Sequence, residues 1–172
     1  MKPRYRDLDL NALTFDDLRW ALAYWRSLCD GRQAPAWEKV DLAAFPPAIL
    51  PRVCVVDVTP PPVDFRYRFW GTSITNMHHY DLTGKSVRKL TPADYAECIW
   101  KQYMRVFETG APAGFITEVP LERGLMSYYA VVRMPLSDDG KALNQVLSAE
   151  AYGEQAGELR RHFEELWQAG SA

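Results

Sequence analysis

Apolar residues recur every three or four positions in three stretches of the chain, a spacing that is typical of amphipathic helices. The stretches are residues 14–30, 91–110 and 154–168, and Thr14 and Thr91 stand where N-caps of the first two helices are expected. Each stripe predicts that its helix packs on another layer, through Phe15, Leu18, Leu22 and Trp25, through Tyr95, Ile99, Tyr103, Val106 and Phe107, and through Leu159, Phe163, Leu166 and Trp167.

Apolar segments rich in β-branched and aromatic residues predict five strands, at residues 52–59, 65–71, 114–122, 125–136 and 144–152. Turn signals separate the first two strands from each other and the last three from one another, so each group is expected to pair antiparallel. Two short helical pieces are expected between Thr72 and Leu90. The predicted class is therefore α+β, with a five-stranded antiparallel sheet and a helical crossover on one of its faces.

The predicted strands carry apolar residues on both faces, as Tyr128 and Tyr129 show in the strand at 125–136. A crossover covers only one face, and soluble monomers rarely expose a large apolar sheet. The helix at 14–30 is therefore expected to cover the second face. The helix at 154–168 either shares that task or meets its equivalent in a second chain, and we expect a homodimer through the terminal helices.

Length and charge exclude several classes of protein. With 172 residues and 48% hydrophobic content, the chain is long enough for one domain, expected to span residues 1–172. The 20 basic and 22 acidic residues give no electrostatic footprint for nucleic acid or an anionic membrane. No segment approaches the roughly 20 apolar residues that span a bilayer. We therefore expect a cytoplasmic protein with no nucleic-acid and no membrane partner.

The three cysteines, Cys29, Cys54 and Cys98, form no CxxC pair, so neither a disulfide framework nor a zinc site is predicted. Cys54 lies in the apolar segment "RVCVVDV", where a buried structural cysteine is expected and a catalytic thiol is not.

The stretch from Arg66 to Pro92 holds the residues that come nearest to a chemical motif. Gly71 and Gly84 belong to no phosphate-binding array. His78 and His79 are consecutive, and neighbouring side chains on a helix point about 100 degrees apart, so one is expected to pack and the other to lie at the surface. No nucleophile elbow or clustered acid pair occurs. We therefore predict no metal site, no catalytic residue and no enzyme.

The order of the predicted elements resembles the PAS domain, and the resemblance covers residues 50–152. It becomes more specific in "FRYRFWGTSI" followed by "DLTGKSV", which is similar to a bacterial PAS-type family of small proteins. The matching positions are Arg68, Gly71, Thr72 and the turn Asp81–Lys85. The helices at 14–30 and 154–168 would flank this core.

The resemblance implies a ligand position in the cleft between the sheet and the crossover helices. The expected ligand-binding residues are Arg68, Trp70, His78, Tyr80, Tyr103, Phe107 and Tyr128. The alternative is that the aromatic side chains serve only as core. In "FRYRFW", strict alternation places Arg68 on one face with Arg66 and Trp70. If that face borders the cleft, Arg68 is a half-buried cation that needs a carboxylate, from Asp57 or from a ligand.

The cofactor is unknown from sequence. Some proteins of the PAS superfamily hold haem through a histidine, usually on the long crossover helix, and its flavin-binding light sensors use an Asn-Cys-Arg motif. Residues 91–110 contain no histidine, and the motif is absent. The resemblance therefore disfavours both haem and flavin.

Two functions remain open. The first is a stand-alone sensory or small-ligand-binding module that signals through a protein partner or by dimerisation. The second is a small α+β barrel-type enzyme that uses a histidine as its base, and the order of the strands would separate the two.

Overall fold

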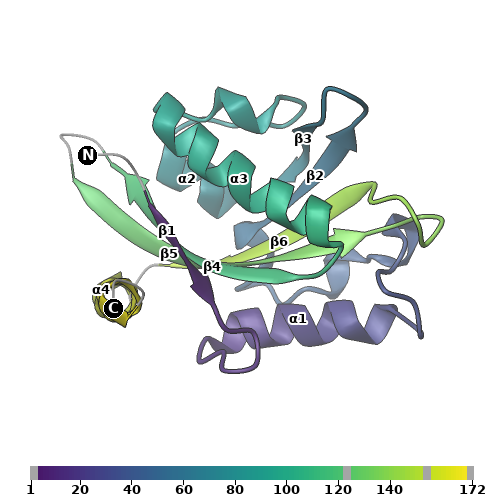
Figure 1. The fold of residues 1–172 in the computed structure, drawn as a ribbon, viewed down its shortest axis with the longest axis horizontal. Coiled ribbons are helices and arrows are strands. Elements are labelled where there is room, and N and C mark those ends of the chain that lie inside the picture. Colours follow the sequence, from purple (N-terminus) through teal and green to yellow (C-terminus); the bar gives the residue numbers. More distant parts are fainter. Residues whose placement is uncertain (1–3, 122–124, 153–155, 170–172) are drawn as a thin grey trace.

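A six-stranded antiparallel sheet separates two layers of helices (Figure 1). This computed structural model describes residues 4–121, 125–152 and 156–169. The five predicted strands are all present, so the predicted α+β class with an antiparallel sheet is confirmed. From one edge to the other the strands are β1 (Tyr5–Leu8), β4 (Ala113–Pro120), β5 (Met126–Leu136), β6 (Gln145–Ala151), β2 (Val53–Thr59) and β3 (Asp64–Trp70).

The sixth strand, β1, corrects the prediction of a five-stranded sheet. It pairs with β4, with Tyr5 opposite Thr117 and Leu8 opposite Gly114. A Cβ atom at Gly114 would lie 2.9 Å from the carbonyl oxygen of Leu8, so the glycine permits the close approach of the two strands. Only one of the four residues of β1 is buried, and so short a segment carries no period-two pattern that sequence analysis can detect.

The crossover helices cover one face of the sheet (Figure 1). They are α2 (Thr72–His78), a single 3-10 turn at Val87–Lys89, and α3 (Ala93–Thr109). The core on this face joins the predicted stripe of α3 to side chains of the sheet, among them Cys54, Val56, Phe65, Tyr67, Phe115, Tyr129, Val131 and Val146. The two predicted helical pieces between Thr72 and Leu90 are therefore confirmed.

The terminal helices α1 (Asp16–Leu28) and α4 (Ala156–Ala169) cover the opposite face (Figure 1). Leu18 and Leu22 of α1, and Leu159 and Phe163 of α4, lie in one buried cluster with the sheet. The expected cover by the N-terminal helix is thus confirmed, and α4 shares it. The start of the predicted helix at residues 154–155 lies outside the described residues.

Neither expected N-cap threonine occupies the N-cap position. The N-cap of α1 is Phe15 instead of Thr14, and that of α3 is Pro92 instead of Thr91, in both cases without a side-chain capping bond. Both helices carry acidic side chains in the first turn, which favour a helix N-terminus by their charge. The boundaries therefore shift by one or two residues while the predicted helices themselves stand.

A β-bulge interrupts the alternation of β3. Val55 of β2 pairs with Phe69 and Val56 pairs with Tyr67, so Arg68 has no opposite residue. Beyond the bulge, Phe69 packs in the layer of α1 and Trp70 packs under the crossover. The prediction that Arg68 and Trp70 share a face is therefore wrong, because strict alternation does not hold across an extra residue.

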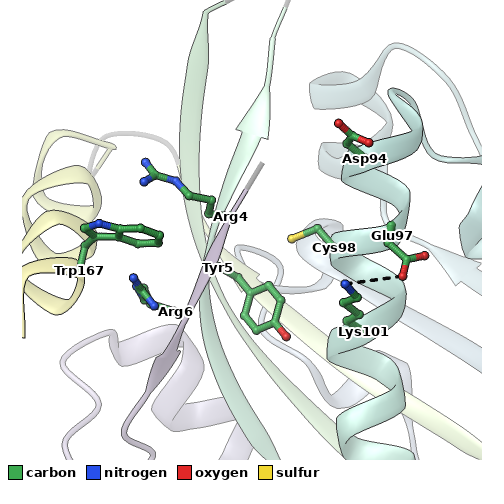
Figure 2. A pocket seen from close by; sticks show the side chains of 8 residues that line it. All are labelled: Arg4, Tyr5, Arg6, Asp94, Glu97, Cys98, Lys101 and Trp167. Atoms are coloured by element: carbon green, nitrogen blue, oxygen red, sulfur yellow. Dashed lines mark ion pairs between the residues drawn. The ribbon is translucent and has the colours of Figure 1, made fainter. Parts of the chain in front are cut away.

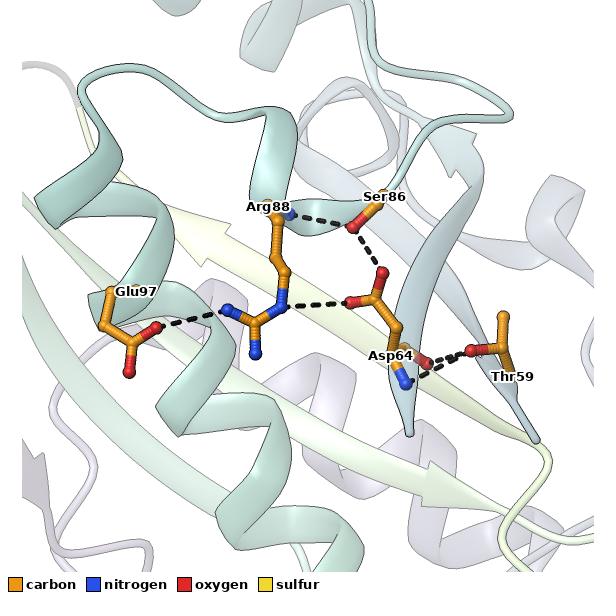
Figure 3. A network of polar contacts seen from close by, with 5 residues as sticks. All are labelled: Thr59, Asp64, Ser86, Arg88 and Glu97. Carbon is orange, nitrogen blue, oxygen red and sulfur yellow. Dashed lines mark hydrogen bonds and ion pairs between the residues drawn. The ribbon is translucent and has the colours of Figure 1, made fainter. Parts of the chain in front are cut away.

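Polar contacts tie the hairpin of β2 and β3 to α3 (Figure 3). Asp64 accepts a hydrogen bond from the hydroxyl of Ser86 at 2.6 Å and lies 3.9 Å from Nε of Arg88. Arg88 also pairs with Glu97 of α3 at 3.3 Å. The network links α3 to the sheet, and the helix forms one wall of the cleft between them.

Candidate functional site

Four side chains form a row across the crossover face of the sheet. In the register of the strands, Arg133 of β5 lies opposite Ser148 of β6, Ser148 opposite Cys54 of β2, and Cys54 opposite Trp70 of β3. Directly opposite residues of an antiparallel pair share a face. Four strands therefore place a cation, a hydroxyl, a thiol and an indole side by side beneath α3.

Arg133 is 1% exposed, and its hydrogen bonds go to neutral groups. Its Nε and Nη2 donate to Oε1 of Gln102 at 3.0 and 2.9 Å, and its Nη1 donates to Oγ of Ser148 at 3.0 Å. The guanidinium carbon lies 4.0 Å from the centre of the Tyr103 ring, within the range of a cation–π contact. Within the described ranges, no carboxylate forms an ion pair with Arg133.

A small enclosed space, which we call the inner cavity, lies beside this row. It offers about 10 Å³ for the centre of a water molecule, which is room for about one water. Its walls are Cys54, Tyr67, Trp70, Ile74, His78, Leu90, Tyr95, Ile99, Tyr103, Tyr129, Arg133 and Glu150. Side chains thus fill most of the cleft, and as they are placed they leave no space for a ligand larger than a water.

The hydroxyl and thiol groups of the inner cavity are neutral. The hydroxyls of Tyr95 and Tyr129 are 3.2 Å apart, and Sγ of Cys54 lies 3.5 Å from the hydroxyl of Tyr103. Burial raises the pKa of the Cys54 thiol to about 11, and it raises the pKa values of the tyrosines as well. Cys54 is buried, as predicted, and remains a thiol at neutral pH.

Two polar atoms of the cavity walls stay without a partner. Oε2 of Glu150 and Nε1 of Trp70 are buried and form no hydrogen bond within the part of the chain that the structure describes. Burial raises the pKa of Glu150 to about 7, although the charges of Arg133 and Arg52 lower it. An acceptor and a donor therefore remain available beside the cation.

His78 separates the inner cavity from a larger groove at the surface, which we call the outer groove. The groove has a volume of about 610 Å³ and is lined by Met77, His78, His79, Tyr80, Thr91, Pro120, Leu121 and Leu125. His78 is half-buried and His79 is exposed, so the expectation that one histidine packs and the other lies at the surface is confirmed. Burial lowers the pKa of His78 to about 4, with a smaller contribution from His79.

The structure brings only part of the predicted site together. Trp70, His78 and Tyr103 line the inner cavity, whereas Tyr80 lines the outer groove beside His78. Phe107 packs in the same core, 6.5 Å from the ring of Phe65, but it lines neither space.

Arg68 and Tyr128 lie on the other face of the sheet. Nε of Arg68 donates to Asp57 at 2.7 Å, which is the internal pair that the sequence allowed, and its side chain is 42% exposed. Tyr128 packs against Phe163 of α4, with ring centres 5.3 Å apart. The neighbouring Tyr129 is the tyrosine that faces the cavity.

Sequence analysis missed Arg133, Gln102 and Glu150. The signal for Arg133 was present, because the alternation that places Tyr129 and Val131 on one face continues to Arg133. A charged residue inside a long apolar strand is rare enough to mark a site. Gln102 on α3 and Glu150 on β6 carry no comparable signal, since their roles depend on which elements meet.

A second surface cleft, of about 390 Å³, lies between β1, α3 and α4 (Figure 2). Figure 2 shows its charged side chains on both walls, together with Trp167 of α4. Arg4 already pairs with Glu118 at 2.7 Å, and Lys101 lies 3.7 Å from Glu97. The guanidinium carbon of Arg6 lies 3.5 Å from the centre of the Trp167 ring. Most of the charged side chains are thus engaged within the protein, so we place no site in this cleft.

Two further findings limit the kinds of site to consider. In residues 4–121, 125–152 and 156–169, no cluster of His, Cys, Asp or Glu is arranged to hold a metal ion. No helix in these ranges is long and apolar enough to cross a bilayer.

A sheet of this kind, with a helical crossover enclosing a cleft on one face, defines the class of PAS-type sensory domains. A sequence model of the PAS domain matches residues 15–149, which is most of the chain, and the protein belongs to the PAS domain family. No curated protein matches in sequence.

Solved structures of light-oxygen-voltage domains have a similar fold. The light-state dimer of the fungal blue-light photoreceptor Vivid superposes with a TM-score of 0.51 at 12% identity, covering 84% of this chain and 100% of that chain. An RNA-binding light-oxygen-voltage receptor gives a TM-score of 0.50 at 12% identity, covering 98% of this chain and 43% of that chain. At such identities the likeness extends to the fold alone.

Acidification is expected to destabilise the protein through His78. Its pKa is lowered from 6.5 to about 4 in the folded protein, so between these values the unfolded chain binds a proton that the folded chain does not. The stability contributed by His78 is therefore lost as the pH falls through this window, by up to about 3 kcal/mol at about 1.4 kcal/mol per pH unit. Urea unfolding of the wild type and of His78→Phe across the window measures it.

Glu150 is expected to act with the opposite sign and serves as the control. Its raised pKa means that the folded protein holds a proton that the unfolded chain releases, so this contribution is lost as the pH rises from 4.5 to about 7. Glu150→Gln removes this dependence of the unfolding free energy on pH, so the dependence that is due to His78 can be measured separately. If the difference in unfolding free energy between the wild type and His78→Phe does not change with pH, the imidazole is not shielded from water.

Proposed function

We propose that this PAS domain is a sensory module that binds a small ligand in the inner cavity. The observation that carries the proposal is the buried Arg133, whose hydrogen-bond partners are the neutral side chains of Gln102 and Ser148. A buried charge whose hydrogen-bond partners are all neutral is costly, because neutral partners replace only part of its hydration. Glu150 in the same cavity wall has its pKa raised by burial to about 7, so near neutral pH it is charged in only part of the molecules. An acidic group of a ligand would supply the missing charge.

The unpartnered atoms nearby support the same site. Nε1 of Trp70 and Oε2 of Glu150 lie in the walls of the same cavity and are buried without partners. Buried polar atoms in proteins are rarely left unpaired, and an exception calls for an explanation. A ligand carboxylate that meets the guanidinium of Arg133 could also accept a hydrogen bond from the indole of Trp70 and, where Glu150 is protonated, from its carboxyl group.

We further propose that the ligand is neither flavin nor haem. α3 carries no histidine, and the sequence lacks the Asn-Cys-Arg motif of flavin-binding light sensors. An absorption spectrum of the purified protein measures this directly, since a haem Soret band or a flavin spectrum that survives desalting would contradict it.

Signalling is proposed to run through a protein partner or through a homodimer of the terminal helices. The apolar stripes of α1 and α4 pack on their own sheet, so a dimer would use the outer faces of these helices. Light scattering of the full chain tests the dimer. We propose no enzymatic role: His78, the histidine of the proposed site, is neutral and forms no ion pair within the described part of the chain, so no carboxylate activates it as a base.

Native mass spectrometry of freshly purified protein tests the ligand proposal. We expect a small molecule to co-purify with the wild type and to be lost from Arg133→Met, because a hydrogen bond to a charged group contributes about 1.5–3 kcal/mol. Arg68→Met is the matched control, since it removes an arginine from the opposite face. A molecule retained by Arg133→Met and lost from Arg68→Met would contradict the proposed site.

A further inference from the structure

We infer that the ligand of the inner cavity is a small aromatic monocarboxylate, and that it passes from the outer groove into the cavity when the side chain of His78 swings aside. The inference rests on the proposed function, because it takes the inner cavity to be the ligand site.

The position of His78 carries the inference. It is the one residue, among those described, that lines both the inner cavity and the outer groove. The groove offers about 610 Å³ at the surface, whereas the cavity holds about one water. A ligand larger than water therefore reaches Arg133 by this route only if His78 moves.

The packing of His78 suits a side chain that moves. Its imidazole lies against the rings of Trp70, Tyr80 and Tyr95, with ring centres 5.7, 5.5 and 5.6 Å away. No hydrogen bond or ion pair of this side chain is present within the described ranges. Its lowered pKa also keeps the imidazole uncharged, so its displacement breaks no polar contact with the described residues.

The space that the imidazole of His78 occupies indicates the kind of ligand. Since the imidazole already fits among three aromatic side chains, a flat single ring can replace it there. Arg133 lines the same cavity, and its buried guanidinium donates three of its five N–H groups to Gln102 and Ser148. The N–H groups that remain can donate to one carboxylate. A space for one flat ring beside one cation favours a ligand with one aromatic ring and one carboxylate.

The outer groove suits the apolar part of such a ligand. Its wall includes Leu121 and Leu125, which are 39% and 64% exposed and are the exposed large hydrophobic residues of the described ranges. Tyr80 stands next to them, and its hydroxyl accepts a hydrogen bond from the backbone N–H of Thr91 at 3.1 Å, which fixes the rim. The apolar ring of the ligand binds first at these leucines and then passes His78.

Benzoate is the probe, and benzyl alcohol is its uncharged match. Their affinities for the full chain are measured by calorimetry and their rate constants by stopped-flow tryptophan fluorescence. In His78→Ala we expect both the association and the dissociation rate constants of benzoate to rise at least about tenfold, with a smaller change in affinity, because the substitution removes a barrier on the path. His78→Trp is expected to slow both rates, so the gate is tested in two directions.

Two controls separate the gate from simpler explanations. His162→Ala removes a histidine from α4 in the other helix layer and is expected to leave the rates unchanged within about twofold. Arg133→Met, placed in the His78→Ala background, is expected to weaken benzoate roughly 10- to 100-fold and to leave benzyl alcohol unaffected. This second control shows that benzoate does not merely fill the space that His78→Ala creates.

The outcomes have distinct meanings. Benzoate rates that are the same in wild type, His78→Ala and His78→Trp overturn the gate and leave the proposed function standing. The ligand class is overturned if benzoate binds none of these proteins, or if Arg133→Met leaves the affinity for benzoate unchanged. The proposed function itself fails only if native mass spectrometry also finds no small molecule in the wild type.

Discussion

Arg133→Ala is expected to lower the free energy of unfolding by about 2–4 kcal/mol. The substitution removes a large buried side chain and leaves Oε1 of Gln102 without either of its two donors. Gln102 is fully buried, so no water replaces these bonds. Urea unfolding followed by circular dichroism gives the change, with wild type and variant measured at the same pH.

The matched control removes both partners together. In the double variant Arg133→Met with Gln102→Leu, apolar side chains of similar size replace the cation and its main acceptor, and most of the lost stability is expected to return. Recovery of stability together with loss of the ligand would show that Arg133 serves binding more than folding. A double variant as unstable as Arg133→Ala would instead make this polar cluster a requirement of the fold.

Trp25→Ala is expected to lower the free energy of unfolding by about 3–5 kcal/mol. Trp25 of α1 is 4% exposed, packs against the sheet, and donates from Nε1 to the carbonyl oxygen of Pro135 at 2.8 Å. The alanine therefore opens a cavity and also leaves a buried acceptor unpaired. Trp25→Phe keeps most of the packing and isolates the hydrogen bond, at about 1–3 kcal/mol.

Trp20→Ala is the comparison within the same helix. Trp20 is half-buried and stacks on Tyr24 with ring centres 5.3 Å apart. Trp20→Ala is therefore expected to lower the free energy of unfolding clearly less than Trp25→Ala does. A negligible effect at Trp25 would mean that α1 does not belong to the core of the domain.

Much of the fold follows from local patterns in the sequence. The strands β2 to β6 are long enough for β-branched and aromatic residues to mark them, and α1 and α3 have complete apolar stripes. β1 lacks both length and pattern, because pairing with β4 alone makes it a strand. The inner cavity was harder to predict: Trp70, His78 and Tyr103, which were named from the sequence, line it, while the contact of Gln102 with Arg133 depends on which strand the helix faces.

Two of the named residues, Tyr128 and Arg68, lie on the face away from the cavity for separate physical reasons. Tyr128 and Tyr129 were correctly assigned to opposite faces, but alternation alone does not say which face the crossover covers, and Tyr129 is the one that lines the cavity. Arg68 was misplaced because alternation was carried across a bulge, and no residue of β3 announces that bulge in the sequence.

The bulge at Arg68 has a consequence for the comparison of related chains. Because Arg68 faces no residue of β2, it is an addition to an otherwise regular strand, and Tyr67, Phe69 and Trp70 occupy the faces that strict alternation would assign if Arg68 were absent. A relative that lacks this one residue would keep both aromatic layers intact. Its alignment to this chain would then require a single-residue gap at Arg68, and an alignment without the gap that matches β3 up to Tyr67 would pair Trp70 with a residue of the opposite face.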